Sequence, residues 1–197
     1  MLTVQQLYKK PLENEYSSLG LSHYMPLLFC NVEDLFEINL KLYSNLVQQE
    51  SKPPSLSAAF KPIIHDMKQY NTYCTNQSNA LETVERLSET NPRFVDFIEN
   101  VKFMVESRRE NLASYLTKPF QRITRYPLLL EQLIKYAPKS GNERSDLTAV
   151  KLEIDEVVAH ANEAKRLIDS VVKMIEVQSS FTWQGDVCIT FCYKDIL

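Results

Sequence analysis

The sequence LASYLTKPFQRITRYPLLL occupies residues 112–130 and combines an apolar face with a basic face. Residues spaced three or four apart share one side of an α-helix, and the basic face has this spacing: Lys118, Gln121, Arg122 and Arg125. The apolar face keeps the same rhythm as far as Ala137: Leu112, Leu116, Pro119, Ile123, Tyr126, Leu130 and Leu133. The spacing predicts an amphipathic helix over residues 112–137.

Two prolines, Pro119 and Pro127, lie inside this predicted helix. A proline in a helix interior removes one backbone donor and costs about 3 kcal/mol in a free interior position. We therefore expect the helix to bend or loosen at Tyr126-Pro127. Packing geometry or a functional role would each explain such a costly pattern. The basic face is equally open to two interpretations, a solvated face of a core helix or a binding surface.

Three further apolar stripes predict long helices that pack lengthwise in a bundle. They run from Leu56 to Val84, from Asn142 to Val177, and from Leu28 to Leu46. Asn91-Pro92 predicts the start of a shorter helix, with Asn as N-cap and Pro at the first helical position, ending at Met104 or Val105. The expected fold is all-α, an elongated bundle of long helices.

The last segment has a different period. Apolar residues alternate with Cys188, Thr190 and Cys192 over residues 181–193, as in a β-strand. A single strand is not stable alone, so this segment packs on the bundle, pairs with a partner, or begins a further module. We expect a helical domain over residues 1–178 and a short non-helical tail over residues 179–197.

The composition excludes several classes of protein. Three glycines in 197 residues are few for hairpin turns or phosphate-cradling loops, and a net charge of -3 does not favour nucleic acid as partner. The sequence contains no leader pattern and no apolar run of membrane-spanning length, so we expect a cytoplasmic protein. We find no nucleophile–base pair, P-loop or metal-ligand spacing, and expect neither covalent chemistry nor a cofactor.

Residues 112–130 closely resemble the third conserved region of the Dbl-homology domain, the exchange domain of Rho-family guanine nucleotide exchange factors. The family pattern is L-x-S-x-L-x-K-P-x-Q-R-x-x-x-Y-x-L-L-L, and these residues match it: Leu112, Ser114, Leu116, Lys118, Pro119, Gln121, Arg122, Tyr126, Leu128, Leu129 and Leu130. Three other segments, Tyr8 to Leu12, Leu28 to Leu35 and Tyr70 to Ala80, resemble further family motifs in the family's order. The resemblance covers residues 7–175 and implies the Dbl-homology fold.

The resemblance also implies an activity without covalent chemistry. Members of this family bind a Rho-family small GTPase most tightly when it is empty of nucleotide, which shifts the GTPase toward that state. They remodel its two switch segments and disturb its magnesium site, so that GDP leaves faster and GTP replaces it. We expect a Rho-family GTPase as partner and any recruitment to a membrane through other regions. The preferred GTPase and the oligomeric state stay open.

Five motif residues are expected to bind the GTPase because of their positions in the family pattern. Gln121 and Arg125 match family residues that contact the second switch, and lysine is common where Arg125 stands. Asn162 matches an asparagine of the last helix that touches the GTPase. Lys118 and Arg122 also belong to the motif, although packing or capping explains Lys118 as readily as binding does.

Two departures from the family pattern bear on function. Glu110, which we also assign to the GTPase-binding surface, stands where the family often has an apolar residue that helps to choose among GTPases. The family's first conserved region begins well before the segment at Pro11 and carries an acidic residue that contacts the first switch. The sequence begins at Met1, ten residues before Pro11, so we expect no counterpart of that residue within it. The two hypotheses are an exchange factor, or a GTPase-binding or scaffold module with weak or no exchange activity.

Overall fold

The computed structural model describes residues 1–14, 20–49, 55–138 and 141–180. Within these ranges the chain forms helices and no β-strand, which confirms the predicted all-α fold. The elements are η1 (Val4–Lys9), α1 (Lys10–Asn14), α2 (Met25–Phe29), α3 (Val32–Gln49), α4 (Leu56–Phe60), η3 (Asp66–Lys68), α5 (Gln69–Thr90), α6 (Pro92–Phe103), η4 (Val105–Ser107), α7 (Leu112–Ile123), α8 (Tyr126–Tyr136) and α9 (Glu143–Ser180).

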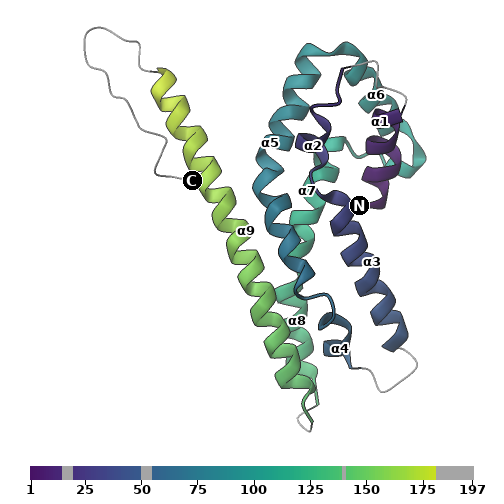
Figure 1. The fold of residues 1–197 in the computed structure, drawn as a ribbon, viewed down its shortest axis with the longest axis vertical. Helices are drawn as coiled ribbons and strands as arrows, with labels where there is room; N and C mark the ends of the chain where they lie inside the picture. Colours follow the sequence, from purple (N-terminus) through teal and green to yellow (C-terminus); the bar gives the residue numbers. More distant parts are fainter. Residues whose placement is uncertain (15–19, 50–54, 139–140, 181–197) are drawn as a thin grey trace.

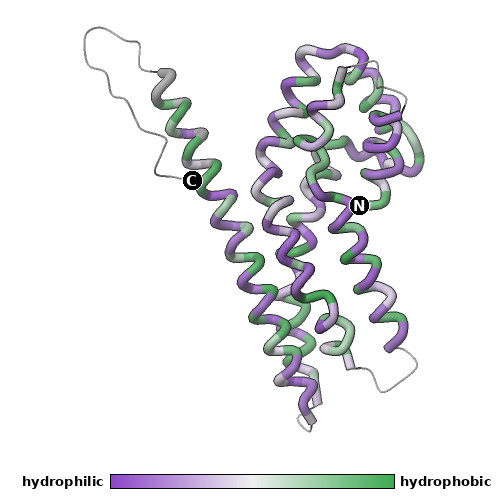
Figure 2. Tube along the Cα trace, viewed as in Figure 1, coloured by the Kyte–Doolittle hydropathy of each residue, from purple (hydrophilic) through white to green (hydrophobic). Residues whose placement is uncertain are grey.

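The helices form an elongated bundle in which α5 is central (Figure 1). It contacts α7 and α2 on one side and α9 on the other, while the first half of α9 also packs against α8. The apolar stripe of α9 is buried as far as Ala161. Beyond this point α9 extends away from the bundle, where Leu167 and Met174 are exposed, and hydrophobic residues continue along it (Figure 2).

Two predicted helices agree closely with the structure. The helix expected from Asn142 to Val177 is α9, which begins at Glu143 and ends at Ser180. The helix expected after Asn91 is α6, and the side-chain oxygen of Asn91 accepts a hydrogen bond from the amide of Phe94 at 3.1 Å. The strand predicted over residues 181–193 lies outside the described residues, and the domain boundary at 178 stays a prediction.

The single helix predicted from Leu56 to Val84 is wrong. It consists of α4, a turn over residues 61–65, η3 and α5. Pro62 has no N–H to donate to the carbonyl of Ala58, which ends the first helix. The apolar period continues across the turn because Ile63 and Met67 are buried there.

The single helix predicted from Leu28 to Leu46 is also interrupted. The α2 helix ends at Phe29 and α3 begins at Val32. Cys30, between them, has a φ of 45°, which is outside the helical range. The chain therefore changes direction within a stripe whose apolar residues are buried on both sides of the break.

The helix predicted over residues 112–137 is divided into α7 and α8. Pro127 has no N–H to donate to the carbonyl of Ile123, so the ladder stops and Thr124 and Arg125 form a turn. The Thr124 hydroxyl donates to the Phe120 carbonyl at 3.1 Å and stabilises this end. The loosening expected at Pro127 is confirmed, but one continuous helix is wrong.

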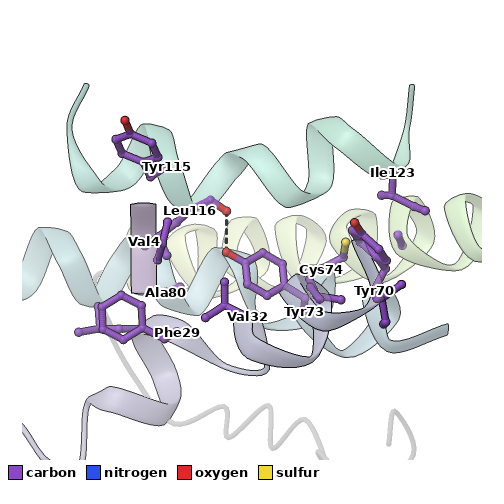
Figure 3. Close-up of a cluster of buried hydrophobic side chains, with 14 of the residues drawn as sticks. Val4, Phe29, Val32, Tyr70, Tyr73, Cys74, Ala80, Tyr115, Leu116 and Ile123 are labelled. Carbon is purple, nitrogen blue, oxygen red and sulfur yellow. Dashed lines mark hydrogen bonds between the residues drawn. The ribbon is translucent and has the colours of Figure 1, made fainter. Parts of the chain in front are cut away.

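A buried hydrogen bond joins α5 to α7 beside the other proline (Figure 3). Pro119 has no N–H for the carbonyl of Tyr115. The hydroxyl of Tyr73, on α5, donates to the neighbouring carbonyl of Leu116 at 2.9 Å. Both Tyr73 and Leu116 are buried, so this bond replaces water at a turn of α7 that solvent does not reach.

We expect Tyr73→Phe to lower the free energy of unfolding by about 1–2 kcal/mol, because it leaves a buried carbonyl without its tyrosine donor. Urea denaturation measures the change. Tyr136→Phe is a matched control because Tyr136 is exposed at the end of α8. Equal stability of the two variants would contradict a role for this bond.

The start of α9 is fixed to the start of α4 by Glu143. One carboxylate oxygen accepts from the Ser57 amide at 2.8 Å. The other accepts from the hydroxyls of Ser57 at 2.7 Å and Ser55 at 2.8 Å. Burial alone would raise the pKa of Glu143, but these hydrogen bonds outweigh it and hold the pKa below its ordinary value of 4.5.

Because the pKa of Glu143 is lowered in the folded state, its contribution to stability is present above about pH 4.5 and is lost as the pH falls through the folded pKa. We expect Glu143→Gln to cost about 1–2 kcal/mol at neutral pH, with a difference from the wild type that shrinks in acid. Denaturation at several pH values measures it, and Glu131→Gln, at an exposed position on α8, should show no such trend.

Candidate functional site

A groove of about 780 Å³ lies between the N-terminal residues, α3 and the α7–α8 segment. Its lining residues are Met1, Leu2, Phe36, Asn39, Leu40, Tyr43, Lys118, Pro119, Gln121, Arg122, Arg125, Tyr126 and Leu129. This set contains three basic residues and no acidic one. The groove therefore combines an apolar floor with positive charge, which suits a partner that brings apolar side chains and carboxylates.

The groove receives its basic residues from α7 because the opposite face of that helix is buried. Leu112, Leu116 and Ile123 pack in the core, and Asn111 caps the helix by accepting from the Ser114 amide at 2.8 Å. The turn that Pro127 imposes then ends the helix. As a result Arg125, at that turn, lines the same groove as the α7 residues before it.

Lys118 is held by contacts within the chain. Its ammonium forms an ion pair with Glu110 at 2.5 Å and lies 4.1 Å from the centre of the Tyr115 ring. Both charged side chains are more than one third exposed, so the pair itself contributes little to stability. Its effect is to hold Lys118 at the edge of the groove and to bring Glu110 to that edge as well.

Arg122 is held by a chain of hydrogen bonds that reaches the core. Its Nε donates to the Tyr126 hydroxyl at 2.7 Å, and that hydroxyl donates to Oδ1 of Asn39 at 3.0 Å. Nδ2 of Asn39 lies 2.8 Å from the hydroxyl of Tyr70, which is fully buried. Burial raises the pKa of Tyr126, although the neighbouring Arg122 lowers it, so the hydroxyl keeps the proton that it donates.

Gln121 and Arg125 differ from these two residues because their side chains point to solvent without a partner in the described part of the chain. Both are exposed. The Thr124 hydroxyl lies 3.1 Å from the backbone carbonyl of Gln121 as well as from that of Phe120, and this contact does not involve the Gln121 side chain. Arg125 makes no ion pair with any described residue. Their donors are therefore available to a second molecule.

Asn162 does not line the groove. It is exposed on α9, next to Glu163, whose carboxylate pairs with Arg166 at 2.7 Å. One turn further along, the ammonium of Lys165 lies 5.3 Å from the centre of the Phe120 ring. This contact connects the neighbouring part of α9 to α7, and Asn162 itself lies outside the groove lining.

The sequence patterns missed the half of the groove that α3 provides. The buried stripe of α3 is Leu35, Ile38 and Leu42. A second apolar stripe at the same helical spacing lines the groove or continues beyond it: Phe36, Leu40, Tyr43 and Val47. A helix that is apolar on two faces indicates two packing partners, and this was the signal that could have located the groove.

The site offers binding groups rather than reactive ones. Among the described residues no three His, Cys, Asp or Glu side chains gather where they could hold a metal ion. No described helix combines the length and apolar composition needed to cross a bilayer. The chemistry visible in the groove is that of guanidinium, amide and apolar contacts.

Comparison with known proteins agrees with this description. The RhoGEF domain family model matches residues 1–162, and the chain belongs to that family. The resemblance of the α7–α8 segment to the Dbl-homology motif is therefore confirmed.

Several relatives share part of the chain. Myosin-M heavy chain of Dictyostelium discoideum is 35% identical over 158 residues, which are 78% of this chain and 9% of that protein. Rho guanine nucleotide exchange factor 4 of Homo sapiens is 29% identical over 164 residues, 81% of this chain and 24% of that protein. The chain thus spans less than a quarter of the length of these relatives.

Solved structures share the fold. A structure of Vav1 with an allosteric inhibitor has a TM-score of 0.80 at 21% identity and covers 93% of this chain and 33% of that chain. A structure of human RhoA in complex with the DH/PH fragment of PDZRHOGEF has a TM-score of 0.75 at 24% identity, covering 82% of this chain and 48% of that chain.

We expect Tyr126→Phe to lower the free energy of unfolding by about 1–2 kcal/mol, because Oδ1 of Asn39 loses its donor and Arg122 loses its acceptor. The Arg122 Nε proton should also exchange faster with solvent, as NMR can measure. Tyr43→Phe is the control, since Tyr43 is an exposed groove residue. An unchanged exchange rate for Arg122 would show that the hydrogen-bond chain does not hold it.

Proposed function

We propose that this chain is the exchange domain of a guanine nucleotide exchange factor for a Rho-family small GTPase. The observation that carries the proposal is the α7–α8 segment, where family membership coincides with exposed side chains that lack partners. The exchange domain would accelerate GDP release without a covalent step. Relatives named as Rho and Rac exchange factors, and a neighbour crystallised with RhoA, support the choice of partner.

The binding surface we propose is the groove together with the adjacent face of α9. Arg125 and Gln121 would donate to the switch segments of the GTPase, and Asn162 would donate or accept from α9. Arg122 and Lys118 would contribute positive charge from fixed positions, and Glu110 would meet the GTPase at the edge of the groove. Hydrogen bonds to charged groups contribute about 1.5–3 kcal/mol each.

The free energy of these contacts is comparable to the preference for the nucleotide-free state that exchange requires. Shifting a two-state equilibrium from 1:99 to 99:1 takes about 5.5 kcal/mol of preference for one state. Two or three charge-assisted contacts that form only with the nucleotide-free GTPase, together with apolar contacts to α3, supply an amount of that order. Contacts made equally with the nucleotide-bound form would add affinity without exchange.

We expect Arg125→Ala, Gln121→Ala and Asn162→Ala each to slow GDP release by about tenfold or more, equivalent to about 1.4 kcal/mol. Release of fluorescent GDP from purified Rho, Rac-like and related GTPases measures the effect. Helicity should not change, because all three residues are exposed. Arg125→Lys should keep most of the activity, since it retains the charge.

Arg144→Ala is the matched control, because Arg144 is exposed in the first turn of α9 and does not line the groove. This turn lies at the end of the bundle where α8 and α9 meet (Figure 1). If no GTPase of the panel releases GDP faster with the unmodified chain, the exchange proposal is overturned. Tight binding to a nucleotide-free GTPase with unchanged release would instead support the scaffold hypothesis.

A further inference from the structure

The connection between α6 and α7 exposes three consecutive large apolar residues, outside the groove. Phe103 is 75% exposed, Met104 is 44% exposed and Val105 is 89% exposed. We call these three residues the apolar knob. Single exposed apolar residues are common on soluble proteins, but a contiguous exposed group usually marks an interaction site.

Hydrogen bonds hold the apolar knob in this exposed position. Ser107 is fully buried beneath it. The Ser107 hydroxyl donates toward the carbonyls of Lys102 and Met104, each 2.7 Å away, and the Ser107 carbonyl accepts from the Tyr115 hydroxyl at 2.8 Å. Because both ends of the turn are fixed to buried groups, exposure of the knob is a built feature of the fold.

Two arginines follow the apolar knob in an unfavourable backbone conformation. Arg108 has a φ of 50° and Arg109 a φ of 59°, a left-handed region that L residues seldom occupy and that glycine adopts freely. Both are exposed, and neither forms an ion pair with a described residue. Arginine at two successive positions suited to glycine indicates that the side chains matter.

The charged residues next to the apolar knob that form no ion pair with a described residue carry a net positive charge. Glu99 pairs with Lys102 at 3.1 Å, and Glu110 pairs with Lys118. Glu106 is the exposed acid left in this connection, against the two arginines. The formal charge of -3 belongs to the whole chain, but charges more than about 8 Å away are largely screened at physiological salt.

We infer that the apolar knob and its two arginines form a contact for an anionic lipid surface. Membrane association grows with inserted apolar area plus attraction to anionic headgroups and requires no complementary pocket. A stable protein interface takes roughly 20–30 residues on each side, far more than this turn presents. The contact lies in the domain itself, and it would anchor the bundle while leaving the groove free, since no knob residue lines the groove.

Co-sedimentation with vesicles tests this inference. The chain should pellet with vesicles of phosphatidylcholine and phosphatidylserine, and much less with phosphatidylcholine alone. Phe103→Ser combined with Val105→Ser should weaken binding by about tenfold or more, because the inserted apolar area is lost. Arg108→Gly combined with Arg109→Gly should also weaken it by about tenfold or more, because each arginine near an anionic surface contributes about fivefold. The glycine pair should unfold no more easily than the wild type, since glycine suits these φ values.

Matched controls test whether vesicle binding depends on the knob or on exposed charge and apolar side chains anywhere on the chain. Lys68→Ala with Arg144→Ala removes two exposed charges elsewhere, and Leu152→Ser removes an exposed apolar side chain on α9. Both controls should bind like the wild type. Equal binding by the knob variants, or no preference for the anionic vesicles, would overturn the inference.

A second outcome would overturn it in favour of a protein contact. If the knob variants slow GDP release from a lipid-free Rho-family GTPase in solution, the knob belongs to the GTPase-binding surface. If the chain binds vesicles through the knob but does not accelerate GDP release from any GTPase, this inference is upheld and the proposed exchange activity fails. The two proposals are thus tested separately.

Discussion

Two backbone positions that lack an N–H, Pro119 and Pro127, shape the segment on which the rest of this structure depends. At each, the helical ladder loses a bond, and the surrounding structure differs. Near Pro119, α5 supplies the Tyr73 hydroxyl to the α7 backbone in the core. At Pro127 the chain turns and restarts as α8. The first fixes α7 to the centre of the bundle, and the second sets the direction in which α8 leads to α9.

The same turn creates the functional surface. In the turn the Arg125 backbone is still hydrogen-bonded: its amide donates to the Arg122 carbonyl at 3.1 Å, and its carbonyl accepts from the Leu129 amide at 3.1 Å. Arg125 is the residue before α8, and its side chain is exposed and has no ion pair among the described residues. A proline in a helix interior costs roughly 3 kcal/mol. Here the helix ends before Pro127, and the new helix start carries the exposed guanidinium group of Arg125. This accounts physically for a pattern that is expensive for a plain core helix.

The sequence predicted the parts of the fold whose periodicity and caps coincide. The α9 stripe and the Asn91 cap of α6 belong to this group. It predicted the loosening at Pro127 but not the break between α4 and α5, because Ile63 and Met67 are buried there and keep the helical period, although Pro62 was a visible signal. The basic half of the groove was predictable from a motif on one helix. The second apolar stripe of α3 was a signal for the other half, but which helix it would face depends on the packing of two helices far apart in sequence.

Packing also separates basic residues that the sequence treats alike. Lys118 is occupied by Glu110 and the Tyr115 ring, and Arg122 by the Tyr126 hydroxyl. Each would have to give up an internal contact, or share it, to bind a partner fully. Arg125 has no such contact to lose within the described chain, so a partner gains its full hydrogen-bonding capacity. Of the three basic residues, we therefore expect Arg125 to contribute most to binding. Binding free energy is measured against the contacts already made in the free protein, and Arg125 has the fewest to lose.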